Sequence, residues 1–313
     1  MTNTTNQHSS LTNHLAYHVP VLFDETIDAL QINPNGIYVD CTFGGGGHSN
    51  GILKKLSSKG KLIVFDQDAD AEKNVPKDDR IVFVPHNFRH LQRFLRLHKI
   101  IEVDGVLADL GVSSHQFNES ERGFSIRFQG PLDMRMDRRS TTSAKEIIAT
   151  YSEQQLHLLF QQYGEVTNAK TLAKQIVSAR NNAPCNTIEQ FKALISAVVK
   201  GNPNKYLAQV FQALRMEVND EMGALKEMLQ QLPLVLKPGG IAAIITFHSI
   251  EDRLVKNFFK KGSFEEIEEN PFSTTKEEKV FELVNKKPIT ASSEELKKNN
   301  RSRSAKLRVA KKL

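Results

Sequence analysis

The first third of the chain alternates short apolar runs with stretches whose apolar residues recur at helical spacing. Near-continuous apolar runs are typical of parallel strands that are buried on both faces. The sequence predicts four such strands, at residues 36–40, 61–66, 80–86 and 103–111. Predicted helices at residues 49–58 and 88–100 lie between them. This alternation predicts an open, doubly wound α/β sheet.

A fifth apolar run, at residues 239–249, appears much later in the chain. It follows a helical stretch at residues 207–236 and the turn sequence KPGG. About 130 residues therefore separate the fourth strand from the fifth, whereas connections in α/β units are far shorter. This gap predicts an insertion into the sheet.

Four stretches within the gap have helical periodicity, namely residues 143–150, 152–164, 169–182 and 187–200. Ser152 and Thr187 are residue types that cap the first turn of a helix. We therefore predict an inserted helical domain at residues 118–205, within an α/β core formed by residues 14–117 and 206–313.

Composition supports a globular protein with a sizeable core, because 39% of the 313 residues are hydrophobic. Residues 1–13 are polar and have no apolar segment like that of a signal peptide, so we expect a disordered leader. No apolar run approaches the roughly 20 residues of a membrane span, and no membrane partner is expected. Cys41 and Cys185 cannot form a disulfide framework, which favours the reducing cytoplasm.

The net charge of +6 is concentrated at the carboxyl end of the chain. Residues 296–313 contain eight Lys or Arg and no acid, which leaves the other residues with a net charge of −2. Such a basic tail can attract phosphate. A frayed, solvated terminus is the alternative, but the alternating apolar Leu307 and Val309 favour a strand.

Four consecutive glycines, Gly44 to Gly47, follow the first predicted strand. Glycine loses more backbone freedom on folding than any other residue, so such a run is costly. In α/β folds a glycine-rich loop between strand and helix holds nucleotides, because bare main chain approaches the ligand and the helix presents free N–H groups. A tight turn without a ligand is the alternative.

Acidic residues near the loop indicate the kind of ligand. Asp66 ends the second predicted strand, where a carboxylate can accept hydrogen bonds from both ribose hydroxyls of an adenosine-type cofactor. The loop does not read G-x-G-x-x-G, and it has Asp40 and His48 at its edges. A pyrophosphate is disfavoured beside a carboxylate, whereas a cationic cofactor with an amino-acid tail is not. This pattern favours S-adenosyl-L-methionine over a nicotinamide dinucleotide.

Three further residues are candidates for this site. Asp109 closes the fourth strand, where the reaction centre of an open α/β sheet lies, although a helix N-cap is the alternative. Phe88 can stack on adenine, although such residues are more often part of a core. Gln116 has amide donors and an acceptor for polar atoms of a cofactor.

The chain resembles the RsmH family (also called MraW), bacterial methyltransferases that modify the N4 amine of a cytosine in 16S ribosomal RNA. The matching segments include IYVDCTFGGGGHS, DGVLADLGVSSHQF, GPLDMRMD and FHSIEDR, and the resemblance runs from residue 18 to residue 308. It implies a class I S-adenosylmethionine-dependent, Rossmann-like methyltransferase core with an inserted helical substrate domain. His115 and Asn300 stand where the family usually has proline, which affects only the expected loop shape.

The resemblance also implies which residues contact the cofactor: Gly46, Gly47, His48, Asp66, Phe88, Asp109 and Gln116. Familiar amino-methyltransferases have an Asn/Asp/Ser-Pro-Pro-aromatic motif after the fourth strand, and this chain has DLGV there. Asp109 is therefore the candidate catalytic acceptor for the amine proton, unless the cofactor occupies it fully. No metal is expected, since the histidines and cysteines lack ligand spacing.

The implied substrate is the 16S rRNA of the small ribosomal subunit. Residues 122–140 are rich in Arg and aromatic residues, which suits RNA, but a structural loop in which Asp133 and Asp137 pair the arginines is the alternative. Residues 247–253 either line the target pocket or favour the start of the next helix. The candidate RNA contacts are Arg122, Arg127, Arg135, His248, Ser249, Arg301 and Arg303.

Other functions remain compatible with the sequence. These are an amino-methyltransferase with a different target, a non-catalytic RNA-binding or ribosome-assembly protein that retains a cofactor pocket, and a nucleotide-dependent dehydrogenase. A monomer and a homodimer both remain open.

Overall fold

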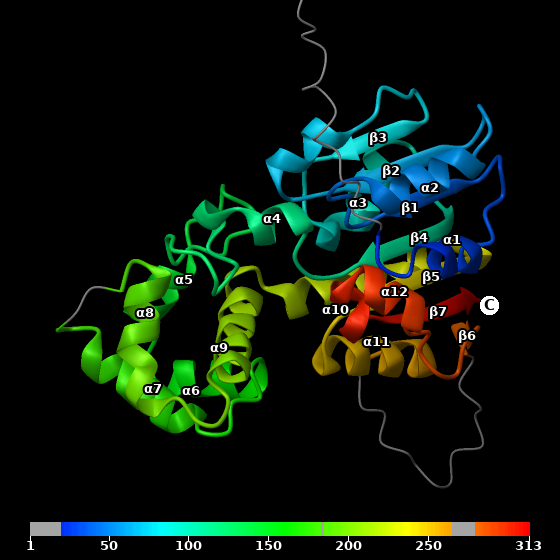
Figure 1. Cartoon of the computed structure of the whole chain (residues 1–313). Helices are drawn as coiled ribbons and strands as arrows, with labels where there is room; N and C mark the ends of the chain where they lie inside the picture. Colours follow the sequence, from blue (N-terminus) through cyan, green and yellow to red (C-terminus); the bar gives the residue numbers. More distant parts are fainter. Residues whose placement is uncertain (1–19, 183–184, 265–278) are drawn as a thin grey trace, which may run out of the picture.

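The structure, a computed structural model, describes residues 20–182, 185–264 and 279–313. These residues contain a seven-stranded sheet of order β3-β2-β1-β4-β5-β7-β6 (Figure 1). The strands are β1 (Ile37–Asp40), β2 (Lys61–Phe65), β3 (Ile81–Val84), β4 (Val103–Asp109), β5 (Leu236–Thr246), β6 (Phe281–Leu283) and β7 (Lys306–Lys312). The leader predicted at residues 1–13 lies outside the described residues.

Strands β1 to β5 pair in parallel, and β7 runs antiparallel between β5 and β6. The chain winds outward from β1 to β3 in one direction and from β4 to β5 in the other. The sheet therefore has a switch point between β1 and β4, where α/β folds bind ligands at the carboxyl ends of the strands. The predicted doubly wound, Rossmann-like fold class is confirmed.

Helices cover both faces of this sheet, which explains why the strands read as continuous apolar runs. One face packs against α3 (Leu91–Leu97), α10 (Glu221–Val235) and α11 (Ser249–Lys261), and the other against α1 (Phe23–Ala29) and α2 (Gly47–Lys55). Side chains alternate between the two cores, so Val39 belongs to the first and Tyr38 to the second.

A second group of helices lies beside the sheet, at the left of Figure 1. These helices are α5 (Ala144–Thr150), α6 (Glu153–Gln162), α7 (Ala169–Ala179), α8 (Ile188–Ile195) and α9 (Pro203–Val218). Their apolar faces form a core of their own that includes Phe160, Phe191 and Phe211. Ser152 and Thr187 cap α6 and α8 as predicted, each within a capping box.

The boundary of this helical group differs from the sequence prediction. The predicted domain ends at residue 205, just inside α9, yet α9 packs on α5 and α6 and its apolar residues lie in their core. The helical stretch expected at residues 207–236 is two helices, because Asp220 adopts a left-handed backbone conformation between α9 and α10. Asn219 at this break binds the Met134 carbonyl and the Met136 N–H.

Short elements complete the described chain: η1 (Ala69–Asn74), η2 (Phe88–His90), α4 (Ser114–Asn118), η3 (Ser120–Arg122), η4 (Ser196–Val198), α12 (Ser293–Lys298) and η5 (Asn300–Ser304). Among the helices in the described ranges, none has the length and apolarity needed to cross a membrane.

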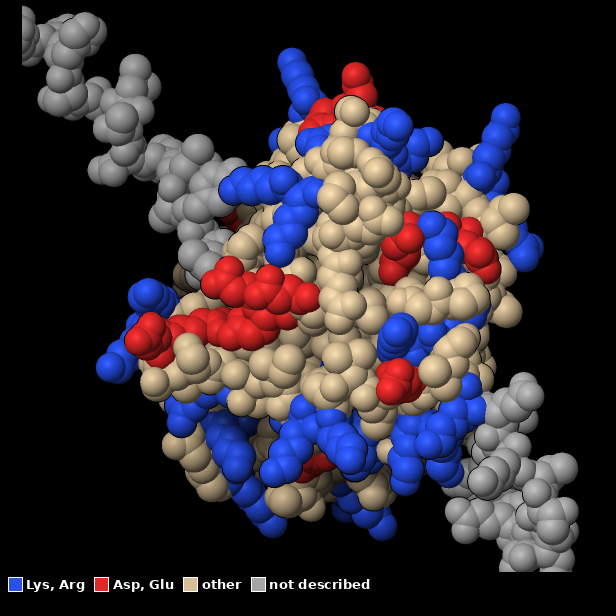
Figure 2. Space-filling view, turned by 90° about the vertical axis from the view of Figure 1, so that its right-hand side faces the viewer, with Lys and Arg blue, Asp and Glu red and all other residues tan. Residues whose placement is uncertain are grey.

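The basic tail ends in a buried strand of the sheet. Leu307 and Val309 of β7 lie in the core beneath α1 and α2, which confirms the strand predicted from their alternation. Arg308 is 8% exposed and forms a two-pronged ion pair with Asp252 of α11, at 2.6 and 3.1 Å. Lys and Arg also gather on the lower part of the face turned away from the inserted helices (Figure 2).

We predict that Arg308→Ala lowers the free energy of unfolding by about 3 kcal/mol, because it removes the two-pronged guanidinium contact from the buried Asp252 carboxylate. Only the longer contact with Lys306, at 3.3 Å, then remains among the ion pairs of Asp252 within the described residues. Lys311→Ala, on the exposed side of the same strand, is the matched control and should change stability by less than about 0.5 kcal/mol. Urea unfolding measures both. Equal effects of the two substitutions would contradict a role for the ion pair in anchoring β7.

Candidate functional site

Three carboxylates come together at the carboxyl ends of neighbouring parallel strands. Asp40 ends β1, Asp66 directly follows β2, and Asp109 ends β4. The order β2-β1-β4 places β1 between the other two strands, so the three side chains share one edge of the sheet. This edge is the one at which open α/β sheets bind ligands.

The glycine loop after β1 has three glycines that the fold itself requires. Gly44 and Gly46 have φ angles of 51° and 75°, which favour glycine. A Cβ atom on Gly47 would lie 2.3 Å from Cγ of Pro20. A Cβ atom on Gly45, by contrast, would meet nothing within 4 Å, and its φ is not in the left-handed region. Gly45 therefore has no packing reason to be glycine, which is consistent with close approach of a ligand.

Asp66 holds the loop and the segment after β2 together. Its Oδ2 accepts a hydrogen bond from the Gly44 N–H at 2.8 Å, and its Oδ1 accepts one from the Asp68 N–H at 2.8 Å. Burial raises the pKa of Asp66 to about 6, so the carboxylate is mainly ionised at neutral pH. Each oxygen has a second lone pair that can accept from a ligand hydroxyl.

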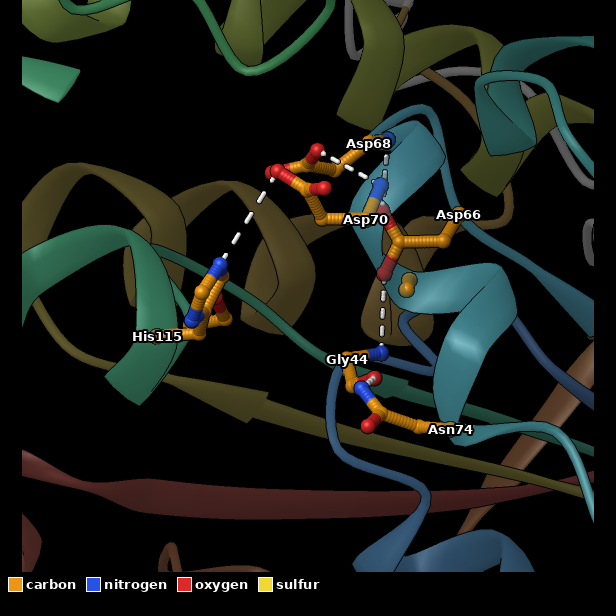
Figure 3. Close-up of a pocket in the computed structure, with 8 residues that line it drawn as sticks. Gly44, Asp66, Asp68, Asp70, Asn74 and His115 are labelled. Atoms are coloured by element: carbon orange, nitrogen blue, oxygen red, sulfur yellow. Dashed lines mark hydrogen bonds and ion pairs between the residues drawn. The ribbon is translucent and has the colours of Figure 1, made fainter. Parts of the chain in front are cut away.

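A small hollow opens beside Asp66, and its rim is acidic. The residues that line it are Gly44, Asp66, Asp68, Asp70, Ala71, Asn74, Ser113 and His115. His115 faces Asp70 across the hollow at 3.9 Å (Figure 3). These lining residues include three carboxylates and no Lys or Arg, which is unfavourable for the pyrophosphate of a dinucleotide.

Gln116 is positioned by a network behind the hollow. It is 5% exposed, and its Oε1 accepts from the Ser113 N–H while its Nε2 donates to Asp68 Oδ2 at 2.8 Å. The same Asp68 oxygen lies 2.7 Å from Nη1 of Arg122. Arg122 is 2% exposed and also donates to the Arg135 and Met136 carbonyls. The guanidinium group of Arg122 is thus enclosed by protein atoms.

Asp40 and Asp109 lie deeper, at the ends of β1 and β4. Asp40 accepts hydrogen bonds from Ser49 Oγ at 2.6 Å and from the Thr42 N–H at 3.0 Å. Oδ2 of Asp109 lies 3.6 Å from Nδ1 of His48, and its Oδ1 is buried without a hydrogen-bond partner among the described residues. Burial, together with the charges of Asp40 and Glu251, raises the pKa of Asp109 to about 8.

The segment after β5 adds another carboxylate, that of Glu251, which interacts electrostatically with Asp109. His248 caps α11, and its Nε2 lies 2.9 Å from Glu251 Oε1. Although burial raises the pKa of Glu251, the neighbouring His248 and Arg215 hold that pKa below its ordinary value. Glu221, His248 and Glu251 are close enough to share a metal ion, but Arg215 already pairs with Glu221 at 2.7 Å. An arginine there supplies the positive charge that a metal would supply.

The segment at residues 122–140 contains the ion pairs that its structural alternative requires. Arg135 pairs with Asp133 at 2.7 Å, and Arg139 pairs with Asp137 at 2.8 Å. Arg127 remains exposed. The segment therefore has both an internally paired part and an exposed basic residue.

The other candidate RNA contacts differ in their exposure. Ser249 and Arg303 are exposed, whereas His248 and Arg301 are partly buried. Arg301 hydrogen-bonds Ser114 Oγ and lies 5.5 Å from the ring centroid of Phe117. It thus ties the carboxyl-terminal segment to α4, next to the hollow. Phe88, the candidate for adenine stacking, lies partly buried at the start of η2.

Sequence reasoning does not single out Asp68 or Glu251, although both contact residues that it does select. The acidic run DQDAD directly after β2 is a usable signal for Asp68. Glu251 stands next to Asp252 in the sequence, and only the structure separates them. Asp252 points to β7 and pairs with Arg308, whereas Glu251 points to the end of β5 and accepts from the Phe247 N–H.

Comparison with known proteins agrees with this geometry. A "Ribosomal RNA small subunit methyltransferase H" from Bacteroides thetaiotaomicron is 52% identical over 299 residues, covering 95% of this chain and 98% of the relative. One of the same name from Christiangramia forsetii is 52% identical over 301 residues, covering 96% and 99%. An rRNA methylase structure from Streptococcus thermophilus covers 93% of each chain at 11% identity, but its TM-score of 0.39 is too low to carry an argument.

The chain also matches the model of a whole family. A model of the MraW methylase family matches residues 15–313, which includes the glycine loop, all three carboxylates, the inserted helices and β7. The chain therefore belongs to the MraW methylase family.

Proposed function

We propose that this chain is an S-adenosylmethionine-dependent methyltransferase that methylates the N4 amine of a cytosine in 16S rRNA of the small ribosomal subunit. The observation that carries the proposal is an acidic ligand site, formed by Asp40, Asp66 and Asp109 at the strand ends, in a member of a methylase family. Curated relatives with more than half of their residues identical are named small subunit rRNA methyltransferases. The rRNA substrate follows from that kinship.

The residues present fit S-adenosylmethionine better than a phosphate-containing cofactor. Each Asp66 oxygen has a second lone pair that can accept from a ribose hydroxyl. At Gly45 a ligand can contact the main chain directly, because no protein atom lies within 4 Å of where a Cβ atom would be. Asp40, and Asp109 once it is ionised, favour a cation in the deeper part of the site by Coulomb attraction. We assign cofactor contacts to the glycine loop with Gly46, Gly47 and His48, and to Asp66, Phe88, Asp109 and Gln116.

When bound, S-adenosylmethionine would supply an activated methyl group and a positive charge. The acceptor amine is a poor nucleophile because its lone pair is delocalised into the cytosine ring, so the protein must orient it and remove a proton. Asp109 is placed for this task at the end of β4, where its Oδ1 has no partner among the residues that the structure describes and 24% of its side chain is exposed. The ionised carboxylate of Asp109 would take the amine proton.

The target base must leave its stack to reach this site. Glu251 interacts electrostatically with Asp109 and lies 2.9 Å from His248. We therefore propose that the segment at the end of β5, with His248 and Ser249, borders the space for the base. Ser249 also contacts Glu165 of the inserted helices at 3.4 Å. We therefore propose that the inserted helices, the segment 122–140 and the exposed Arg127 and Arg303 hold the RNA.

In this proposal Arg122 and Arg135 shape the RNA-binding segment from within, since both are engaged with protein atoms. Arg301 positions α4 through Ser114 and Phe117. We place the enzyme in the cytoplasm, in keeping with two cysteines that are both free thiols.

The function is tested with small ribosomal subunits isolated from a strain that lacks this gene. We expect the purified chain and S-adenosylmethionine to introduce one N4-methylcytosine into 16S rRNA, detected by mass spectrometry of nucleosides. Asp109→Asn should lower the rate at least about 100-fold, as expected for loss of a proton acceptor. Methylation of adenine N6 instead would refute the substrate, and no transfer to free or assembled RNA would favour a non-catalytic RNA-binding protein.

Asp66→Asn should weaken binding of S-adenosylmethionine by about 10- to 100-fold, because hydrogen bonds to a charged acceptor contribute about 1.5–3 kcal/mol. Titration calorimetry measures the affinity. Asp28→Asn, at an exposed position of α1 that pairs with Lys55, is the control and should bind normally. Full affinity in Asp66→Asn would remove this carboxylate from the cofactor site.

Gly45→Ala should leave the fold intact and weaken S-adenosylmethionine binding by about 10-fold, which corresponds to about 1.4 kcal/mol of lost contact. The added methyl group enters open space in the ligand-free protein, so thermal unfolding should be unchanged. Gly47→Ala is the comparison, and it should be destabilised by about 1–3 kcal/mol through its clash with Pro20. Normal cofactor affinity in Gly45→Ala would show that the ligand does not approach this main chain.

A further inference from the structure

The imidazole of His48 has a fixed tautomer. Its Nε2 lies 3.1 Å from the carbonyl oxygen of Val21. A carbonyl oxygen can only accept a hydrogen bond, so Nε2 carries the proton. Burial lowers the pKa of His48 to about 4, which keeps the ring neutral at pH 7. Nδ1 is therefore a bare acceptor.

This bare nitrogen faces the carboxyl group of Asp109. Nδ1 lies 3.6 Å from Asp109 Oδ2. An ionised carboxylate has only lone pairs to present to a neutral Nδ1, so the two would repel each other. A protonated carboxyl presents a hydrogen to it instead. The geometry of the pair thus favours a proton on Asp109 in the ligand-free protein.

The other groups around Asp109 act in the same direction. Burial of the Asp109 carboxyl raises its pKa most, and the negative charges of Asp40 on β1 and Glu251 on α11 raise that pKa further. The basic groups beside Glu251 are already engaged, since His248 lies 2.9 Å from Glu251 and Arg215 pairs with Glu221. No Lys or Arg forms an ion pair with Asp109 among the described residues.

We propose that Asp109 holds a proton in the ligand-free protein, releases it to solvent when the cationic methyl donor binds, and regains a proton from the substrate amine. The inference rests on the proposed function. It adds that the proton produced by the methylation reaction is released to solvent when the methyl donor binds. A positive charge placed beside Asp109 stabilises its ionised form by direct Coulomb attraction. A neutral ligand of the same shape does not.

The atoms and charges of the cycle balance. During transfer a nitrogen–carbon bond forms, the carbon–sulfur bond breaks with its electron pair left on sulfur, and the amine proton moves to the Asp109 carboxylate. The thioether product is neutral, so Asp109 again stands beside an uncharged ligand and keeps the proton. The net proton of the reaction is therefore released on donor binding and not during transfer.

The test compares S-adenosylmethionine with S-adenosylhomocysteine, which differ by the methyl group and its charge. Titration calorimetry of the full chain at pH 7 is repeated in buffers of different ionisation enthalpy, and the slope gives the number of protons exchanged. With a pKa of about 8 for Asp109, linkage predicts release of about 0.9 proton with the methionine ligand and close to none with the homocysteine ligand. Contributions from Asp66 cancel, because both ligands have the same ribose.

Two variants assign the proton to its group. In Asp109→Asn the difference between the two ligands should fall to zero, whereas Asp28→Asn, an exposed control on α1, should keep it. If Asp109→Asn binds neither ligand, the affinities of the natural chain for both ligands are measured as a function of pH instead. The affinity for S-adenosylmethionine divided by that for S-adenosylhomocysteine should then increase about tenfold for each unit by which the pH is raised towards 8. Above pH 8 this ratio should level off.

The outcomes separate this inference from the proposed function. Tight binding of both ligands with equal proton release, or an affinity ratio that does not change with pH, would overturn the inference and leave the methyltransferase function standing. If neither ligand binds, both fail.

Discussion

The structure holds three carboxylates out of water at one edge of its sheet, and the free-energy cost of burying their charge is not offset by a neighbouring cation among the described residues. Three carboxylates, Asp40, Asp66 and Asp109, lie buried or partly buried at one edge of the sheet. Their partners within the described part of the chain are N–H groups, hydroxyls and a neutral imidazole, and none is a cation. Burial of such groups raises their pKa values, which means that folding is less favourable with all three ionised. A bound cation offsets this cost. The site is thus selective for ligand charge before any ligand is present.

The remainder of the fold keeps this edge in place. The antiparallel β7 pairs with β5, and its Arg308 is bound to Asp252 on the helix that follows β5. Buried Arg122 pairs with Asp68, which lines the hollow, and donates a hydrogen bond to the Met136 carbonyl. The hollow and the segment at residues 122–140 are therefore held together. Asn219 adds a further link at the break between α9 and α10.

Much of this arrangement follows from local sequence. The parallel strands, the capping boxes at Ser152 and Thr187 and the glycine loop are set by short-range periodicity and backbone preference. The grouping of β1, β2 and β4 was also predictable, because short connections make the sheet order restrictive. The resemblance to a family supplied the set of proposed cofactor contacts, which residue chemistry alone left open.

What could not be predicted depends on contacts between distant parts of the chain. Helix α9 belongs to the inserted helices because it packs against α5 and α6. The helical periodicity of its sequence shows that it has an apolar face but not which helices that face contacts. The different directions of Glu251 and Asp252 depend on β7, more than 50 residues later. The surroundings of Asp109 also join distant segments: burial and the charges of Asp40 and Glu251 raise its pKa, and His48 lies 3.6 Å from it.

The central claim is that the acidic strand edge holds a cationic methyl donor, and the most direct test is the crystal structure of the chain with S-adenosylmethionine. The account predicts the ribose hydroxyls at Asp66, the methionine end against the main chain at Gly45, and the sulfonium within Coulomb reach of Asp109. A donor bound elsewhere, or a dinucleotide in the hollow beside Asp66, would contradict it.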